Sequence, residues 1–270
     1  MTIMLVLRRL ALVAMMPALT ACDVRVGDKG VSVGIMEGTA SDEWTRSYAI
    51  APGGQVEVLN GNGAIEVFPS VGPEVEIRAL REAKSRTDEA AREMLKQMTV
   101  AEDVAPDRVR VETKQPREGG FLDRVRVTYR VSIPPGLSVS VRSERGGVRL
   151  ENVEGRFTAA STNGTIDGRG VSGAVDASTV NGAIAIELAE VTGDTRLTTV
   201  NGGVRLDIGP GVNAMLEASA VNGGVVIREG FPIETTERER LRVAGRINDG
   251  GPKIVVQTTN GGIVLGGGIK

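Results

Sequence analysis

The chain of 270 residues contains no histidine and only one cysteine. Without histidine, the sequence excludes Ser-His and Cys-His nucleophile pairs, histidine-ligated metal sites and the side chain that most often moves protons near neutral pH. Carboxylates are the remaining acid and base groups. We therefore expect no cofactor and no metal site.

Aromatic residues and an excess of either charge are also scarce. Aromatics make up 3% of the chain, and 32 basic and 34 acidic residues give a net charge of −2. A chain without a basic stripe is not expected to bind nucleic acid. Glycine is frequent at 36 residues. The apolar positions are mostly Val, Ile, Leu and Ala, which predicts a narrow core built from β-strands.

The single cysteine, Cys22, stands directly behind an apolar run that spans residues 10–19. The tetrapeptide Leu19-Thr20-Ala21-Cys22 is the small-residue cleavage pattern of an exported protein. It resembles a bacterial lipoprotein signal, in which the cysteine is lipidated. We expect residues 1–21 to be the signal peptide and Cys22 to carry the lipid; a buried structural cysteine and an uncleaved anchor are the alternatives.

The residues after Cys22 bear on location and on where folding starts. By resemblance to the sorting of Gram-negative lipoproteins, Asp23 favours the periplasmic face of the inner membrane. Residues 22–43 are polar and Gly-rich, which predicts a flexible tether. The folded domain is expected at residues 44–268.

The dipeptide Asn-Gly recurs with similar surroundings. It occurs at Asn163-Gly164, Asn181-Gly182, Asn201-Gly202, Asn222-Gly223 and Asn260-Gly261, and Asn62-Gly63 and Arg145-Gly146 fit the same template. Residues at even offsets before each pair are small or apolar, and residues at odd offsets are largely polar, as in a strand with one buried face. Beyond the pair the apolar columns move to odd offsets, so one residue is absorbed in a corner. Because Gly and Asn tolerate positive φ, we expect the pair to turn the strand there.

Two architectures could place Asn-Gly at turns. Hairpins with two-residue turns predict roughly 8–12 residues between turns, whereas the three contiguous steps here are 18, 20 and 21 residues. A parallel β-solenoid makes each repeat one coil, so that equal offsets stack and the asparagine amides form a ladder along the axis. The asparagines share parity with an inward Ser or Thr two residues earlier, which favours a structural role over ligand binding.

Two segments interrupt the repeat. Within residues 85–98, Ala91, Met94, Leu95 and Met98 recur at helical spacing and predict an amphipathic helix that covers an end of the solenoid. Residues 231–251 are rich in charge and are expected to project or to form an irregular coil. The predicted fold is thus all-β, a single-chain parallel β-solenoid of about 18–21-residue coils with one inserted helix.

The repeat, the early Asn62-Gly63 coil, the helix insertion and the closing Asn260-Gly261-Gly262-Ile263 together resemble a bacterial adhesin-like β-strand-repeat family over roughly residues 47–265. That resemblance implies a β-solenoid exposed at the cell envelope, in a family whose function is largely unestablished.

The repeated polar columns show no concentration of acids, and Asp176 and Asp194 on adjacent coils are interpreted as solvated charges. We therefore expect a non-enzymatic scaffold or interaction module that is held to the membrane by its N-terminal lipid and contacts an envelope protein or glycan. The outward residues expected to make these contacts are Arg156, Asp176, Arg196 and Glu217. The alternatives are a polysaccharide-acting lyase or hydrolase and an accessory protein of an envelope-stress signalling system.

Overall fold

The computed structural model describes residues 22–27, 30–35, 38–117 and 120–267. Most of these residues lie in β-strands, and the helices among them are α1 (Asp88–Lys96) and α2 (Phe121–Arg124). The expectation of an all-β fold is confirmed. Within the described ranges, no helix has the length and apolar content needed to cross a membrane. The expected signal peptide, residues 1–21, lies outside the described residues.

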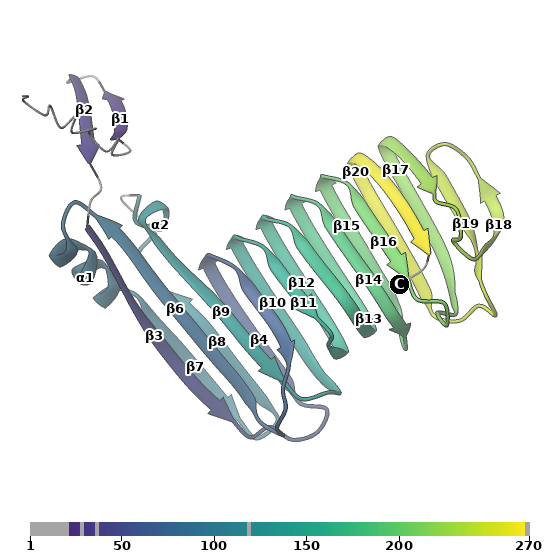
Figure 1. The fold of residues 1–270 in the computed structure, drawn as a ribbon, viewed down its shortest axis with the longest axis horizontal. Helices are drawn as coiled ribbons and strands as arrows, with labels where there is room; N and C mark the ends of the chain where they lie inside the picture. The colour runs from purple at the N-terminus through teal and green to yellow at the C-terminus, as the bar shows by residue number, and fades with distance from the viewer. Residues whose placement is uncertain (1–21, 28–29, 36–37, 118–119, 268–270) are drawn as a thin grey trace, which may run out of the picture.

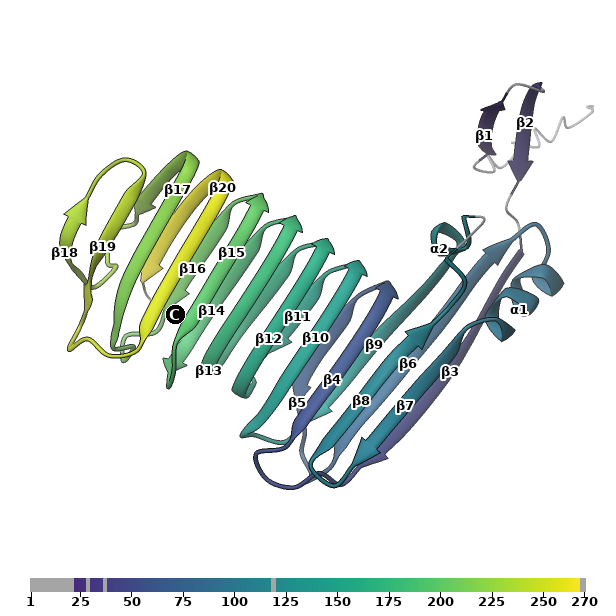
Figure 2. The ribbon, with the colours of Figure 1, turned by 180° about the vertical axis from the view of Figure 1, so that it is seen from behind.

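Parallel strands form two opposed faces of an elongated body (Figures 1 and 2). One face stacks, in spatial order, β8 (Arg108–Lys114), β4 (Gln55–Asn62), β10 (Leu137–Arg145), β12 (Glu154–Asn163), β13 (Ile166–Asn181), β15 (Thr195–Asn201), β20 (Lys253–Gly267) and β17 (Ala214–Ile227). The other face stacks β9 (Val125–Ile133), β5 (Ile65–Pro69), β11 (Val148–Glu151), β13, β14 (Ile184–Val191), β16 (Val204–Ile208), β20 and β17. Alternate side chains point between the faces and form one narrow apolar core.

The closing repeat lies inside the stack, not at its end. Asn201 pairs with Asn260, and Asn260 pairs in turn with Asn222. The steps of 18 and 20 residues from Asn163 to Asn201 follow the chain as expected, but the expected 21-residue step from Asn201 to Asn222 is wrong. Strand β17 stands one place further out, and β20 returns to fill the gap between it and β15.

A hairpin covers part of the outer edge of β17. Strands β18 (Ile233–Arg238) and β19 (Arg242–Ile247) are antiparallel, and β19 pairs with the first half of β17. The expectation that residues 231–251 project or form an irregular coil is therefore wrong. Their charged residues lie in an antiparallel hairpin with one register shift, between Thr235 and Glu237. The backbone of this hairpin pairs with an edge strand that would otherwise be open to pairing with another chain.

The opposite end is closed by antiparallel strands and a helix. Strand β6 (Val75–Ser85) pairs with β3 (Gly38–Tyr48) and β9, while β7 (Thr99–Ala105) pairs with β8. Helix α1 lies within the range in which a helix is expected and packs on β3 and β6 (Figure 1). Its N-cap is Thr87, whose side chain accepts a hydrogen bond from the Ala90 N–H at 3.2 Å.

The segment 22–43, expected to be a flexible tether, contains regular strands. Strands β1 (Cys22–Gly27) and β2 (Gly30–Ile35) form a separate antiparallel hairpin. The main body then begins at Gly38, because β3 pairs with β6 from Gly38 through Tyr48. The boundary expected at residue 44 was placed too late, since the strand's exposed polar residues mask its pairing in the sequence.

Both tyrosines of the chain lie in this N-terminal part of the core. Burial raises the pKa of Tyr129 to about 12, and its hydroxyl lies 2.7 Å from that of Thr113. Burial, together with the Glu102 carboxylate that the Tyr48 hydroxyl contacts at 2.7 Å, raises the pKa of Tyr48 as well. The folded state therefore holds both phenols in their neutral form.

The raised pKa of Tyr129 predicts loss of stability at alkaline pH. A phenol that ionises later in the folded state than in the unfolded state contributes its stability fully below pH ~10, and loses it as pH rises through about 12. We expect the free energy of unfolding to fall by about 2–3 kcal/mol across that window. Urea unfolding followed at several pH values, beside a Tyr129→Phe variant with a shallower decline, measures this. Tyrosinate absorbance that rises near pH ~10 in the folded protein would contradict it.

Candidate functional site

The Asn-Gly corner joins each coil to the next by three hydrogen bonds. Thr179 Oγ1 donates to the Gly164 carbonyl oxygen at 2.9 Å. The Gly164 N–H donates to the Asn181 carbonyl oxygen at 3.1 Å. Asn181 Nδ2 donates to Asn163 Oδ1 at 2.9 Å. The same three contacts recur at the next two steps of the stack, with Thr199 and Thr258 as the hydroxyl donors.

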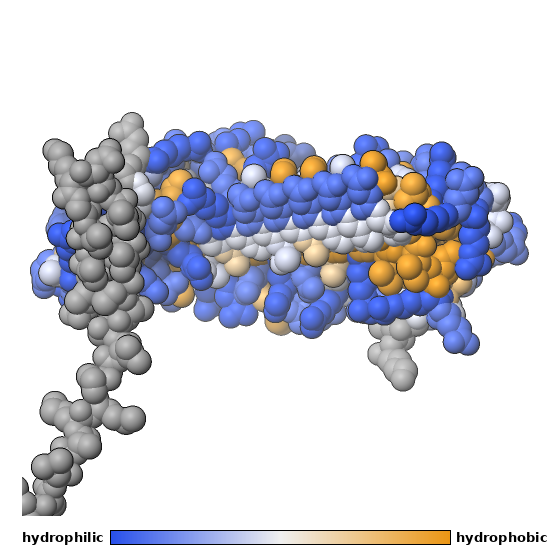
Figure 3. All heavy atoms as spheres, turned by 90° about the horizontal axis from the view of Figure 1, so that it is seen from above, coloured by the Kyte–Doolittle hydropathy of each residue, from blue (hydrophilic) through white to orange (hydrophobic). Residues whose placement is uncertain are grey.

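The asparagine amides make one continuous ladder across five coils. Its rungs are Asn163, Asn181, Asn201, Asn260 and Asn222, joined by Nδ2–Oδ1 distances of 2.8–2.9 Å. In Figure 3, a straight hydrophilic row runs along this edge of the molecule beside a pale row. All five side chains are exposed, whereas the Ser or Thr two residues earlier is buried at four of the five corners. The asparagine and the Ser or Thr two residues earlier therefore do not share a face, because the strand turns at the corner and the asparagine side chain points outward.

The corner glycines are required by close approach of backbones. A Cβ atom on Gly164 would lie 2.1 Å from the Gly146 carbonyl oxygen, and one on Gly182 would lie 2.1 Å from that of Gly164. The expected explanation, positive φ, is wrong for these two glycines and for the ladder asparagines, because the non-Gly residues with positive φ in the described chain are Asn152 and Asn248. At these corners asparagine supplies the amide that bonds along the ladder, and glycine has no Cβ atom to collide with the adjacent coil.

The ladder ends before Asn62, the remaining asparagine expected in it. Arg145 occupies the rung between Asn62 and Asn163, as expected from the sequence, and its Nη1 contacts Asp123 Oδ1 at 2.5 Å. Asn62 Nδ2 instead donates to the carbonyl oxygens of Leu122 and Val125 at 2.6 and 2.7 Å. Cys22, the expected lipidation site, begins β1 in the separate hairpin.

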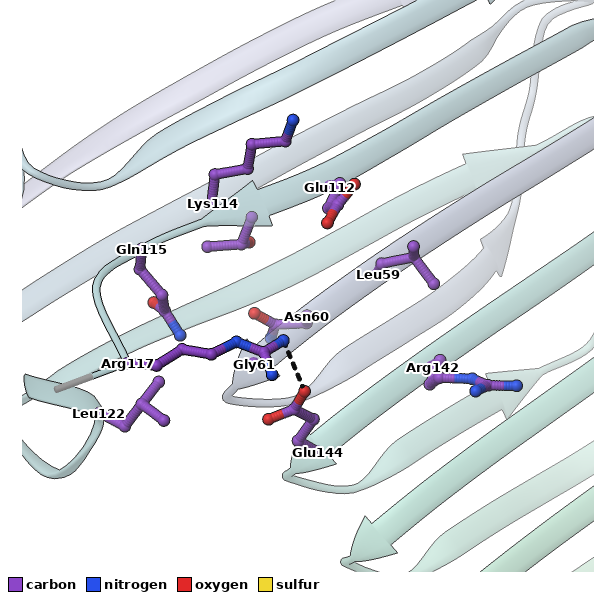
Figure 4. Close-up of a pocket in the computed structure, with 11 residues that line it drawn as sticks. Leu59, Asn60, Gly61, Glu112, Lys114, Gln115, Arg117, Leu122, Arg142 and Glu144 are labelled. Atoms are coloured by element: carbon purple, nitrogen blue, oxygen red, sulfur yellow. Dashed lines mark hydrogen bonds and ion pairs between the residues drawn. The ribbon is translucent and has the colours of Figure 1, made fainter.

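A hollow of about 260 Å³ opens beside β4, where the ladder has ended (Figure 4). Asn60, Gln115 and Arg117 lie close together in this view, whereas Lys114 and Arg142 point away from them. Arg117 Nη2 donates to Glu144 at 3.1 Å, which neutralises the charge beside Asn60. Leu59 and Leu122 add apolar walls. We call it the β4 hollow, and its lining is Leu59, Asn60, Gly61, Glu112, Thr113, Lys114, Gln115, Arg117, Leu122, Arg142 and Glu144.

Asn60 takes the position that a serine or threonine holds in the neighbouring coils, since it pairs with Ser143. Its Nδ2 donates to the Gly63 and Val127 carbonyl oxygens at 3.0 and 2.7 Å, which serves the corner as a hydroxyl would. Its Oδ1 accepts no hydrogen bond from the protein, although the residue is only 4% exposed. A buried acceptor without a partner costs about 1–3 kcal/mol, so the amide is an expensive choice for a purely structural position.

Gln115 adds two more unpartnered polar atoms. Neither its Nε2 nor its Oε1 has a hydrogen-bond partner in the protein, although both atoms are buried. The amide lies over Gly61, where a Cβ atom would come within 2.3 Å of Nε2. Sequence reasoning found neither Asn60 nor Gln115 as a site residue. Asn60 was detectable as the one amide in a column of small hydroxyl residues; Gln115 belongs to no repeat.

The charged residues expected on the outward face lie together there. Arg156, Asp176 and Arg196 line a second hollow of about 290 Å³. Lys253 Nζ lies 3.0 Å from Glu217 Oε2. Asp194 Oδ1 accepts a hydrogen bond from the Lys253 N–H at 2.9 Å, which gives this carboxylate a structural partner. Among the described residues, no group of three or more His, Cys, Asp or Glu side chains is placed to hold a metal ion.

The match to a protein family covers most of the stacked body. Residues 55–265 match the family model described as Toastrack DUF4097. The chain belongs to the Toastrack family. This match confirms the family resemblance drawn from the repeat.

Solved structures resemble this chain at low sequence identity. A candidate cell adhesion protein from Clostridium sporogenes is 8% identical, with a TM-score of 0.50, and the match covers 84% of this chain and 100% of that one. A candidate adhesin from Bacteroides fragilis is 10% identical, with a TM-score of 0.35, covering 84% and 97%. A candidate lipid binding protein from Parabacteroides distasonis is 10% identical, with a TM-score of 0.31, covering 85% and 97%. The similarity to the Clostridium sporogenes structure shows the fold alone. No curated protein matches the chain.

Close backbone approach at the Toastrack corner predicts intolerance to any added side chain. Gly182→Ala should lower the free energy of unfolding by about 3 kcal/mol, since the methyl group meets a carbonyl oxygen of the next coil. Gly211→Ala is the matched control: a Cβ atom there meets nothing within 4 Å, and the change should stay within about 0.5 kcal/mol. Chemical unfolding of both variants measures the difference. Equal losses of unfolding free energy in the two variants would show that the corner can accommodate a methyl group.

The ladder predicts a position-dependent cost of removing an amide. Asn201→Ala breaks two inter-coil hydrogen bonds, to Asn181 and from Asn260, whereas Asn222→Ala at the end of the ladder breaks one. At about 0.5–1 kcal/mol for each exposed bond, we expect losses of about 1–2 and about 0.5–1 kcal/mol. Urea unfolding compares the two variants. A loss at Asn201 no larger than that at Asn222 would mean that the amides do not act as a ladder.

Proposed function

We propose that the chain is a lipid-anchored, non-enzymatic scaffold of the cell envelope that presents its outward faces to an envelope protein or glycan. The observation that carries this proposal is the unbroken corner column. From Asn163 to Asn260, each step of the column fixes a coil to its neighbour by a side-chain amide, a hydroxyl and a backbone bond, and the outermost step, to Asn222, keeps the amide bond. Stacked coils of this kind build extended, quasi-one-dimensional surfaces for contact with partners.

The arrangement of the two ends suits presentation. The hairpin β1–β2, which begins at Cys22, lies by the end that carries α1, and the hairpin β18–β19 closes the opposite end (Figure 1). A lipid on Cys22 would hold the first end at the membrane and leave the faces between the ends accessible. Asp23, next to the lipid, supports retention at the periplasmic face of the inner membrane in a Gram-negative cell.

The chemistry of the outward faces favours contact over catalysis. The chain has no histidine, and Asp194, one of the two neighbouring acids, is engaged by a backbone N–H. Arg156, Asp176 and Arg196 supply charges of both signs on one exposed face. Such mixed charge sets the orientation and specificity of a partner more than it contributes affinity.

The anchor predicts a simple labelling result. In a Gram-negative host supplied with labelled palmitate, the full chain should take up label and sediment with membranes, and Cys22→Ala should do neither. Asp23→Ser is the matched control, because it keeps the lipidated cysteine: label should persist while the protein moves from the inner to the outer membrane fraction. Label on Cys22→Ala, or membrane retention without the cysteine, would overturn the anchor.

The interaction role is tested on the outward face. Photo-cross-linking residues placed at Asp176 and Arg196 of the full chain should capture an envelope protein or glycan in cells, while one placed at the buried Leu197 should capture nothing. Absence of captured partners, together with unchanged adhesion and envelope integrity after gene deletion, would contradict the proposal. Shortening of a polysaccharide by the purified protein would favour the enzyme alternative instead, and loss of stress-kinase signalling after deletion would favour the signalling accessory.

A further inference from the structure

The β4 hollow differs from the rest of the stack in a way that coil packing does not explain. At the neighbouring coil, Ser143 Oγ donates to the Gly63 carbonyl oxygen at 3.0 Å and leaves no unpartnered atom. Asn60, its paired residue, reaches the equivalent carbonyl of Val127 through Nδ2 and keeps Oδ1 free of protein donors. The extra atom therefore serves something other than the corner.

The unpartnered atoms define what a bound group must offer. Asn60 Oδ1 requires a donor, Gln115 Oε1 requires a second donor, and Gln115 Nε2 requires an acceptor. A sugar hydroxyl is donor and acceptor at once, so neighbouring hydroxyls on one ring can meet both kinds of demand. An ionised carboxylate or a sulfate only accepts, and it would leave both oxygens without a partner.

The charge of the hollow points to a neutral ligand. The charged lining residues are of both signs, and the acids are paired: Glu144 accepts from Arg117, and Glu112 accepts from Arg110. The cations Lys114 and Arg142 point away from Asn60 (Figure 4). Arg117 is largely exposed, so its remaining donors, with the Glu144 carboxylate, can bond hydroxyls at the mouth. Leu59 and Leu122 offer apolar surface to ring C–H groups.

We propose that the β4 hollow binds one neutral sugar unit, a hexose or an N-acetylhexosamine, of an envelope glycan. The hollow, at about 260 Å³, has the size for a single small ring and not for an oligosaccharide. This inference rests on the proposed interaction function and names the ligand class for one of its surfaces. With no aromatic side chain in the lining, one sugar binds with a dissociation constant on the order of 1–10 mM. Tighter overall binding comes from many copies of the anchored protein on one glycan.

The test uses the full chain in detergent micelles with labelled side-chain amides. Methyl glucoside or N-acetylglucosamine, added in steps, should shift the Asn60 and Gln115 amide signals, while acetate and inorganic sulfate, which only accept hydrogen bonds, should not. Asn60→Ser, which keeps a hydroxyl for the corner as Ser143 does, and Gln115→Ala should each weaken binding at least ~10-fold. Gln257→Ala, which removes an exposed amide of β20 that lines neither hollow, is the matched control and should bind as the parent does.

Several outcomes would overturn the inference: no shift with either neutral sugar, tighter binding of acetate or sulfate, or unchanged affinity in a folded Asn60→Ser protein. The two proposals fail separately. If sugars do not bind but the outward face still captures a partner in cells, the sugar site is wrong and the scaffold stands. If sugars bind but neither lipid labelling nor capture is seen, the hollow stands and the anchored scaffold is wrong.

Discussion

The close approach of glycine backbones at the corner is the constraint on which the rest of the stack depends. A corner glycine stands so near the carbonyl oxygen of the adjacent coil that no side chain fits between them. That proximity brings the buried hydroxyl of the next coil within reach of the same carbonyl, and it brings the asparagine amides within hydrogen-bond distance of one another. The three contacts are thus consequences of one spacing.

The same constraint separates structure from function along the chain. Positions at the corner are committed to packing, which leaves the outward faces free to vary in charge and shape. Function is then best sought where a corner position departs from the pattern. The amide of Asn60, in a column of hydroxyls, is such a departure, and it faces the β4 hollow where the ladder has stopped.

Much of the fold could be predicted because its information is local and repeated. Period-two alternation, the shift of parity at Asn-Gly and the helical spacing of Ala91, Met94 and Leu95 all report on neighbouring residues. The insertion of β20 between β15 and β17 could not be predicted, since equal repeats can stack in any order and only tertiary pairing chooses among them. The hairpin β18–β19 could not be predicted either. Its many charged residues are typical of a loop, but they are also typical of edge strands.

The site was less accessible to sequence than the fold. The ladder could be inferred as a column, but its physical basis could not, because backbone proximity between coils leaves the same Asn-Gly signal as a left-handed turn. The β4 hollow depends on Gln115 and Arg117, which follow β8 and reach β4 only through the parallel pairing of those two strands. No local sequence pattern predicts that these residues lie close together.

Amide hydrogen exchange at the corner tests the central claim most directly. The N–H groups of Gly146, Gly164, Gly182 and Gly202 each donate to the carbonyl oxygen of the next coil, although the residues beside them at the corner are exposed. If the corner holds the coils together, these four amides will exchange as slowly as those of the buried strands and will open together. Exchange as fast as that of the exposed turn at residues 71–74 would contradict the account.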